Sequence, residues 1–314
     1  MRKVVKDREK NKLSFWKTFV KNIDLTLLMV PGIICYIIWS YLPMFGIIIA
    51  FKRFIPTKGI LGSDWVGFEN FKFFFTSQDA TRITINTLSY GIIFMITGII
   101  AAVFVALLLF EITNHRALKI YQSIIILPHF LSWVIVGYIS YILLNPQAGT
   151  LNQILGFFKI AQIGWYAEPK YWPYILTLAN LWKHIGMSSI VYYAALMGVD
   201  AEMFEAATLD GANKWQRRWY ILIPSLIPLM IILSILGIGN IFRGDFGLFY
   251  QLSRDVGTLY PTTDIIDTYV YRGLRTGDMS ITAAVGLIQS FVGVILVVGT
   301  NLIVKKIDPD SSLF

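Results

Sequence analysis

Charged residues are scarce in this sequence. They make up only 15% of its 314 residues, whereas hydrophobic residues make up 56% and include 22 Phe and nine Trp. An ordinary soluble domain carries about 25% charged residues, so this composition excludes that class. The sequence instead indicates a protein that crosses a membrane several times.

Residues that carry chemistry are equally scarce. Cys35 is the single cysteine, so no disulfide can form within the chain, and its position in an apolar run favours a small buried hydrophobic side chain over a reactive thiol. His115, His129 and His184 show no metal-binding spacing, and no nucleophile with an adjacent base is apparent. We therefore expect no metal site and no catalytic residues.

The sequence also lacks a phosphate-binding loop of the form G-x-x-x-x-G-K-[S/T]. We therefore expect the chain to bind no nucleotide or other cofactor, and any ATP and Mg that drive its activity would be held by another chain. The net charge of +8 is not accompanied by a basic face with interleaved aromatic residues, which argues against nucleic-acid binding.

Long apolar runs are abundant. A spanning helix needs about 20 mainly apolar residues, and six segments satisfy this requirement, at roughly 25–51, 84–110, 121–144, 171–199, 221–241 and 280–304. The predicted fold class is therefore an all-α membrane protein with six transmembrane helices.

Lys and Arg predict the orientation of these helices, because basic flanks are retained on the cytoplasmic side. The termini and alternate loops, 1–23, 111–120, 200–220 and 305–314, hold 15 basic residues in 64 positions, and the other three loops hold 11 in 96. We expect both termini to face the cytoplasm.

The chain divides into a core and a leading part. The predicted parts are a basic interfacial segment at 1–23, a first helix with an aromatic outer loop at 24–80, a five-span core at 81–304 and a cytoplasmic tail at 305–314. Pro31 and Pro43 are expected to kink the first span. Trp65, Phe68 and Phe71 are expected to anchor the outer loop at the headgroup level.

One short stretch, "EAATLDGANKWQRRWYILIP" at 205–224, is polar between two apolar runs. Met203 to Leu209 and Trp215 to Ile221 read as two short helices, and Gly211 permits the sharp turn between them. Such a loop would present Phe204 and its apolar neighbours to the cleft of a partner.

The spacing of this stretch resembles the EAA loop of binding-protein-dependent ABC importer permeases. The matching positions are Glu205, Ala206, Ala207, Gly211, Ile221 and Pro224, with Ile223 where Leu is common. Three further stretches resemble the LplB-type carbohydrate-uptake permeases: "PGIICYIIWSYLPMFGIIIAFKRFIPTKGILGSDWVGFENF", "YPTTDIIDTYVYRGL" and "KKIDPDSSLF".

This resemblance implies a type I importer subunit in a prokaryotic cell membrane. Its implied partners are a second, homologous permease, two ABC ATPase subunits that use ATP and Mg, and an extracytoplasmic solute-binding lipoprotein that delivers an oligosaccharide. By the same resemblance, the loop at 200–220 couples the permease to the ATPase. The residues assigned to coupling are Met203, Phe204, Glu205, Ala206, Ala207, Leu209, Asp210, Gly211, Trp215 and Pro224.

The stretch "NLWKH" contains the candidates for the substrate path. Asn180 and Lys183 offer hydrogen-bond donors, Trp182 offers a stacking face, and His184 lies beside them. Because an ionisable group inside a membrane is costly, a cavity or a partner group should receive Lys183 and His184. The alternative is that the span starts later and Lys183 reaches the outer interface.

Polar residues after the fifth span are candidates for docking the binding protein. They are Arg243, Asp245, Asp264, Asp267, Tyr269 and Arg272, and a solvated loop surface explains them equally well. Two other functions also stay open at this point. The chain could transport a non-sugar solute in the same type of machinery, or it could be a secondary carrier that needs no ATPase.

Overall fold

The computed structural model describes residues 22–307 and is almost entirely helical. The structure of residues 1–21 and 308–314, which include most of the predicted interfacial segment and tail, lies outside the described part. The first third of the chain contains α3 (Ile23–Tyr36), η1 (Ile37–Tyr41), η2 (Leu42–Phe51), β1 (Lys52–Arg53), α4 (Gly59–Gly62), β2 (Asp64–Trp65), α5 (Glu69–Thr76) and α6 (Gln78–Phe110).

The remaining elements follow in two groups. The middle of the chain contains α7 (His115–Ile126), η3 (Leu127–Phe130), α8 (Trp133–Leu144), α9 (Thr150–Phe157), η4 (Pro169–Tyr171), α10 (Trp172–Leu196), α11 (Ala201–Leu209), α12 (Lys214–Arg217) and η5 (Arg218–Leu222). The last part contains α13 (Ile223–Gly239), α14 (Phe246–Ser253), η6 (Gly257–Leu259), α15 (Tyr260–Thr263), α16 (Ile266–Thr276) and α17 (Met279–Ile307).

Four helices of the described chain are long and apolar enough to cross a membrane, namely Ile23–Phe51, Gln78–Phe110, Lys214–Gly239 and Met279–Lys306. The bent pair formed by α7–η3 and α8 brings the number to five if it counts as one span. α10 has 25 residues, yet it is not among the four. These helices establish a multi-pass membrane protein, and the count of six spans stays a prediction.

The third predicted segment, 121–144, is not one continuous helix. The chain bends by 94° between Phe130 and Trp133. Pro128 lies in the short 3₁₀ helix η3 before the bend, and the Ser132 hydroxyl accepts a hydrogen bond from the Ile135 N–H at the start of α8. A proline that lacks an N–H, followed by a serine N-cap, ends one helix and begins another.

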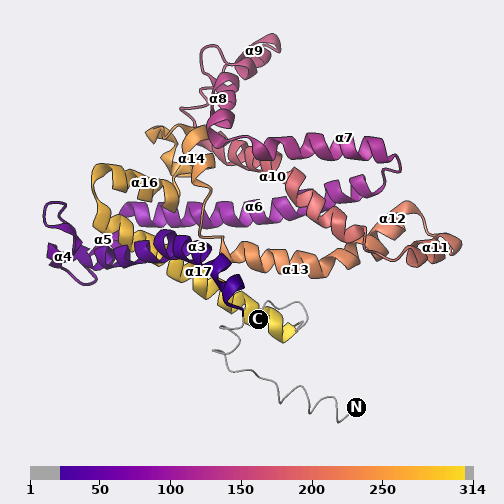
Figure 1. The fold of residues 1–314 in the computed structure, drawn as a ribbon. Coiled ribbons are helices and arrows are strands. Elements are labelled where there is room, and N and C mark those ends of the chain that lie inside the picture. Colours follow the sequence, from indigo (N-terminus) through magenta and orange to yellow (C-terminus); the bar gives the residue numbers. More distant parts are fainter. Residues whose placement is uncertain (1–21, 308–314) are drawn as a thin grey trace, which may run out of the picture.

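One of the buried clusters lies where α6, α10 and α13 run side by side (Figure 1). Ala102 and Ala106 of α6 are fully buried against Tyr192 of α10 and Leu226 of α13. Small side chains at these two positions let the helix backbones approach closely. In Figure 1 the α11–α12 hairpin lies at one end of these helices, and α4 and α5 lie at the opposite end.

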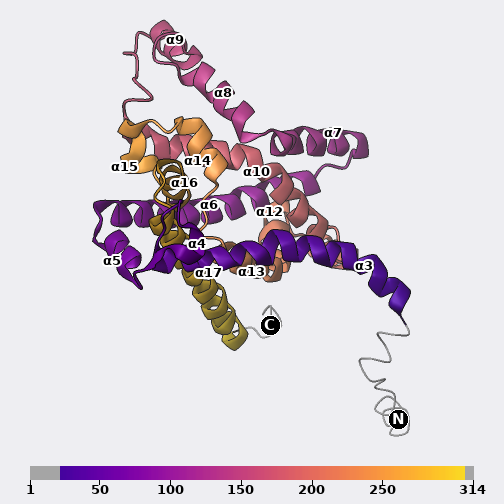
Figure 2. The same ribbon diagram turned by 60° about the vertical axis from the view of Figure 1, so that its left-hand side comes forward.

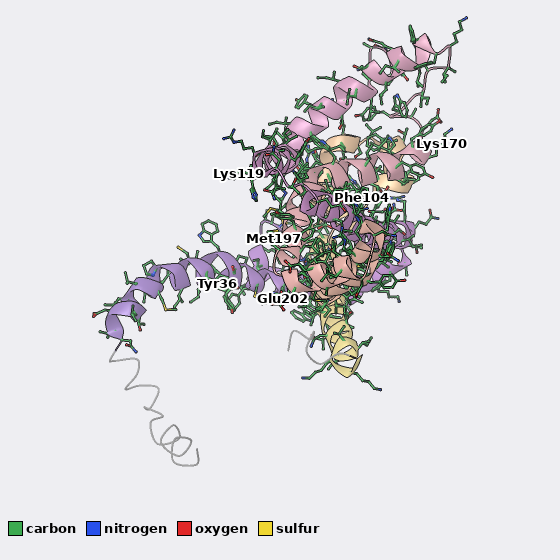
Figure 3. All side chains as sticks on the ribbon, turned by 90° about the vertical axis from the view of Figure 1, so that its right-hand side faces the viewer. Tyr36, Phe104, Lys119, Lys170, Met197 and Glu202 are labelled. Atoms are coloured by element: carbon green, nitrogen blue, oxygen red, sulfur yellow. The ribbon has the colours of Figure 1, made fainter. Side chains whose placement is uncertain are left out.

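The first predicted span is irregular. Pro31 lies inside α3, a π-helical turn covers Ile37–Tyr41, and Pro43 lies in the first turn of the following 3₁₀ helix. α3 extends away from the other helices, and Tyr36 points outward from it (Figures 2 and 3). Cys35 lies on this helix and is exposed, so the prediction of a buried cysteine is wrong, because α3 has little protein around it.

The predicted outer loop contains a small sheet that the all-α prediction did not include. β1 and β2 pair antiparallel, with Lys52 opposite Trp65. Phe51 stacks on Trp65 at 5.8 Å between ring centroids and contacts Phe68 and Phe71 at 5.5 and 5.2 Å. The three predicted anchor residues therefore form one aromatic cluster around Phe51, which holds the hairpin closed.

Candidate functional site

The polar stretch at 200–224 forms a helical hairpin whose turn is set by a glycine. The side chain of Asp200 caps α11 at the Glu202 N–H. At the other end the Ala212 N–H donates to the Ala207 carbonyl, and the Gly211 N–H donates to the Thr208 carbonyl. Gly211 has a φ of +79°, as this Schellman type of helix end requires. The predicted turn at Gly211 is confirmed.

The second short helix of the prediction is not separate. Asn213 and Gln216 form a capping box at the start of α12. From there the chain continues through a π-helical turn into α13, so that Lys214–Gly239 is a single helix. The prediction of an independent helix from Trp215 to Ile221 is therefore wrong, because Asn213 is followed by no residue that ends the helix before the apolar run. Pro224 lies in the first turn of α13.

The hairpin presents an apolar surface outward. Leu209 is 89% exposed and Trp215 is 63% exposed, although both are large hydrophobic side chains. Met203, Glu205, Ala206 and Asp210 are also exposed, and Ala207 is half-buried. Phe204 differs from them, because its ring packs on Phe110 at 5.7 Å. Most of the residues assigned to coupling are thus free to contact a partner.

One interaction ties the hairpin to α6, and a second joins its two arms. Arg218 forms an ion pair with Glu111, which directly follows α6. Arg217 Nη1 lies 3.1 Å from Thr208 Oγ1, so that the second arm of the hairpin is bonded to the first. A displacement of the hairpin would therefore act on α6 and on α13 together.

Lys183 does not line the predicted substrate path. It is only 6% exposed, and its ammonium group donates to the carbonyl oxygens of His129 at 3.0 Å and Pro128 at 3.4 Å, and to that of Leu131. These carbonyls lie where the bend between α7 and α8 interrupts the helix, and the three donors of an ammonium group match them. A partner group therefore receives Lys183, as predicted, but it is the backbone and not a sugar.

Asn180 and His184 lie at a different place from Lys183. They line a cavity of about 720 Å³ between α6, α10 and α13. Phe94, Met95, Met187 and Leu233 supply apolar walls, and Asn240, Arg243 and Asp245 supply polar groups. Trp182, the predicted stacking residue, is exposed and does not line this cavity.

The polar end of the cavity is organised around Asp245. Its carboxylate accepts hydrogen bonds from Trp133 Nε1 at 2.6 Å and from the Leu248 N–H at 3.2 Å. His184 Nε2 lies 3.9 Å away. Burial alone would raise the pKa of Asp245, but His184, the Leu248 N–H and Trp133 outweigh it and lower the pKa below its ordinary value. Asp245 is therefore a fixed negative group at the rim.

Four of the predicted docking residues have internal roles. Asp264 has no exposed side-chain surface, and it pairs with Arg82 at 2.9 Å and with Arg272 at 2.5 Å. Asp267 accepts hydrogen bonds from the Gly244 N–H at 2.8 Å and from Gln289 at 3.1 Å. Tyr269, the fourth of these residues, packs on Phe74 with 6.1 Å between the ring centroids. Asp264 is thus unavailable to a binding protein, because it neutralises two arginines inside the fold.

Sequence reasoning missed the function of Arg82 and Trp133. Each pairs with an aspartate that is more than a hundred residues away in the chain. No local pattern marks such pairs, although an arginine in the first turns of an apolar helix is unusual enough to indicate a buried partner.

Several known proteins are similar to this chain. The sequence profile described as "Binding-protein-dependent transport system inner membrane component" matches residues 95–310. Protein LplB of Bacillus subtilis (strain 168) is 36% identical over 299 residues, which cover 95% of this chain and 93% of LplB. The polygalacturonan/rhamnogalacturonan transport system permease protein YteP of the same organism is 35% identical over 304 residues, covering 96% and 94%.

A solved structure is also similar. It is the crystal structure of a bacterial alginate ABC transporter in complex with an alginate pentasaccharide-bound periplasmic protein. One of its chains matches with a TM-score of 0.84 and 30% sequence identity, over 94% of this chain and 98% of that chain.

Proposed function

Because the chain belongs to the family of binding-protein-dependent transport system inner membrane components, we propose that it is a permease subunit of an ATP-driven importer for acidic oligosaccharides. Members of this family are transport components and not enzymes. YteP is named for polygalacturonan and rhamnogalacturonan, and the similar structure is that of an alginate transporter. Both names denote polysaccharides that contain sugar carboxylates.

The cavity between α6, α10 and α13 carries this proposal. Its volume of about 720 Å³ lies within the usual range for small-molecule sites. Arg243 offers a guanidinium group, which suits a carboxylate. Asn180 and Asn240 offer amides for sugar hydroxyls, and Phe94 offers an aromatic face. Asp245 lies at the same rim and would favour a substrate oriented with its carboxylate toward Arg243.

The proposal includes a topology and partners. Six spans with both termini in the cytoplasm would put the α11–α12 hairpin on the cytoplasmic side. There its exposed Leu209 and Trp215 would enter a cleft of an ATPase subunit. Two such subunits would use ATP and Mg, a second permease would complete the pathway, and an extracytoplasmic lipoprotein would deliver the sugar in a prokaryotic cell membrane.

A transport assay tests the substrate class. We expect cells that carry the complete transporter to take up a labelled galacturonate trisaccharide. Arg243→Gln should raise the concentration for half-maximal uptake by about tenfold, the usual order of one charge-assisted hydrogen bond. Lys170→Gln is the matched control, because it removes an exposed cation that pairs with Glu168 away from the cavity.

Two results of the uptake assay would contradict the proposal. Uptake of neutral oligosaccharides, peptides or phosphate in preference to the acidic sugar would refute the substrate class and leave the family unaffected. Equal uptake by Arg243→Gln and wild-type protein would remove the cavity from the substrate path.

A further inference from the structure

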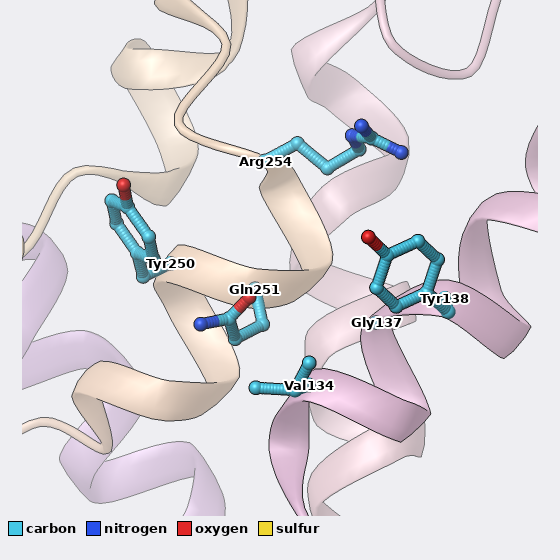
Figure 4. Close-up of a pocket in the computed structure, with 6 residues that line it drawn as sticks. All are labelled: Val134, Gly137, Tyr138, Tyr250, Gln251 and Arg254. Carbon is cyan, nitrogen blue, oxygen red and sulfur yellow. The ribbon is translucent and has the colours of Figure 1, made fainter.

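A second, smaller pocket lies outside the cavity, between α8 and α14. It has a volume of about 200 Å³ and is lined by Val134, Gly137, Tyr138, Tyr250, Gln251 and Arg254. Figure 4 shows the α14 residues on one side, the α8 residues on the other, and the Arg254 side chain extending from the end of α14. No carboxylate lines the pocket.

The two helices that form this pocket are held at a fixed spacing. A Cβ atom at Gly137 would lie 2.8 Å from the Gln251 carbonyl oxygen, so that α8 and α14 touch at a point where only glycine fits. Trp133 of α8 donates to Asp245, the N-cap of α14, at 2.6 Å. The pocket is therefore preformed and does not depend on a ligand to shape it.

Arg254 supplies a positive charge that the fold does not neutralise. It ends α14 in the left-handed conformation, with a φ of 56°. Its guanidinium lies over the Tyr141 ring at 4.1 Å, and within residues 22–307 it forms no ion pair. The neighbouring carboxylate of Asp255 is engaged elsewhere, by Arg272 at 3.0 Å. On the other side of the pocket, Arg275 lies 3.4 Å from the Tyr250 hydroxyl.

The residue types identify the ligand chemistry. A guanidinium binds a carboxylate through paired hydrogen bonds, tyrosine rings offer both an apolar face and a hydroxyl, and the Gln251 amide can bond a hydroxyl group. The volume is that of a single sugar ring. α14 has Asp245 of the cavity at one end and Arg254 at the other, and its eight residues span about 12 Å. An oligosaccharide can bridge this distance.

We propose that this pocket is a subsite for one carboxylate-bearing sugar unit of the substrate, separate from the cavity. This inference rests on the proposed function, because it requires an acidic oligosaccharide as substrate. The Arg254 guanidinium binds the sugar carboxylate, and Tyr138 and Tyr250 bind the ring.

The test uses the complete transporter in nanodiscs, with a thiol placed at the pocket. Val134→Cys in a Cys35→Ser background puts a cysteine on the pocket wall. Its alkylation is followed by mass spectrometry on the peptide that contains residue 134. We expect a galacturonate trisaccharide to slow alkylation, and Arg254→Gln to raise the concentration for half protection by about tenfold. Lys159→Gln, which removes an exposed cation elsewhere, should leave protection unchanged.

A second sugar separates charge from shape. The same trisaccharide with its carboxyl groups reduced to alcohols should protect the thiol about as poorly as the acidic sugar protects in Arg254→Gln. Equal protection by both sugars, or protection that Arg254→Gln leaves intact, would overturn the subsite. So would a loss of binding-protein association in Arg254→Gln without any sugar, because a partner side chain would then be the occupant.

The two proposals can fail separately. If the Val134→Cys transporter imports the acidic trisaccharide but the sugar gives no protection, the subsite is refuted and the proposed function stands. If the wild-type transporter does not import the trisaccharide at all, the proposed function fails, and the subsite fails with it.

Discussion

Asp264 offers the sharpest test of how the segment after α13 is held. Its carboxylate is fully buried and pairs with Arg82 of α6 and Arg272 of α16. Thr268 Oγ1 donates to it as well, at 2.8 Å. Asp264→Asn preserves the size of the side chain and removes its charge. Two half-buried guanidinium groups then lose their shared counter-ion.

The magnitude follows from what remains after this change. Removing one partner of a buried ion pair costs about 3–5 kcal/mol when the other charge is left alone. Here Arg82 keeps Asp79 at 2.7 Å, and Arg272 keeps Asp255 at 3.0 Å. Because neither arginine is left alone, we expect a loss below that range, about 2–3 kcal/mol in the free energy of unfolding.

Thermal unfolding of the purified transporter measures this effect. Asp64→Asn is the matched control, because Asp64 is exposed and pairs with Lys58 at 3.6 Å; exposed pairs of this kind contribute about 0–1 kcal/mol. A double-mutant cycle with Arg82→Met should show coupling between Arg82 and Asp264. If Asp264→Asn has the same unfolding temperature as Asp64→Asn, or if the cycle shows no coupling, the ion pairs of Asp264 with Arg82 and Arg272 do not stabilise the fold.

Three further predictions concern the hairpin, the bend and a second buried carboxyl. Gly211 has a φ of +79°, so Gly211→Ala should cost about 1 kcal/mol of local stability, and Gly156→Ala, in open helical space, is its control. Gly211→Pro should abolish uptake at an unchanged membrane level, because proline fixes φ near −65° and removes the hydrogen bond to the Thr208 carbonyl. Normal uptake by Gly211→Pro would contradict coupling. Lys183→Met should destabilise the protein by about 1–2 kcal/mol in thermal unfolding, since unpaired carbonyls at the bend cost more than the buried ammonium saves; Lys170→Met should not. Burial raises the pKa of Asp267, although the hydrogen bonds from Gly244 and Gln289 lower it in part. The free energy of unfolding should therefore fall as the pH rises from about 4, the ordinary pKa, through the raised pKa of the folded protein. Asp267→Asn should flatten that part of a pH–stability scan.

Local sequence patterns predicted the parts of the structure that depend on neighbouring residues. The apolar runs located the long helices, and the turn at Gly211 followed from a glycine between two helical stretches. In both cases the signal lies in the segment itself, where spacing and propensity are informative. The coupling role of the loop comes from the family resemblance and stays a prediction.

Features that depend on distant pairs could not be predicted in this way. Lys183 was expected in the substrate path or at the interface, and it instead bonds carbonyls 52 to 55 residues earlier in the chain. Asp264 was expected on a docking surface, although its partner Arg82 is 182 residues away. Both are ionisable groups in apolar surroundings, so a partner was foreseeable and its identity was not.

The continuous helix from Lys214 to Gly239 gives the hairpin a direct mechanical connection to the cavity. Its 26 residues span about 39 Å. The exposed Trp215 lies in its first turn, and Gly237 in its last turn lines the cavity. The opposite wall belongs to α6, whose last turn is followed by Glu111, the ion-pair partner of Arg218. Both walls of the cavity are thus anchored at the hairpin.

This arrangement limits how the cavity can respond to a partner. A rigid displacement of the hairpin moves the ends of α6 and α13 together, so it tilts both walls without separating them at that end. The Arg218–Leu222 stretch is π-helical and contains the arginine of the ion pair, so we expect α13 to turn relative to α6 at this stretch. A partner that binds one arrangement of this stretch more tightly than the other would shift the equilibrium between the two arrangements. The free energy of that shift cannot exceed the difference between the two binding free energies.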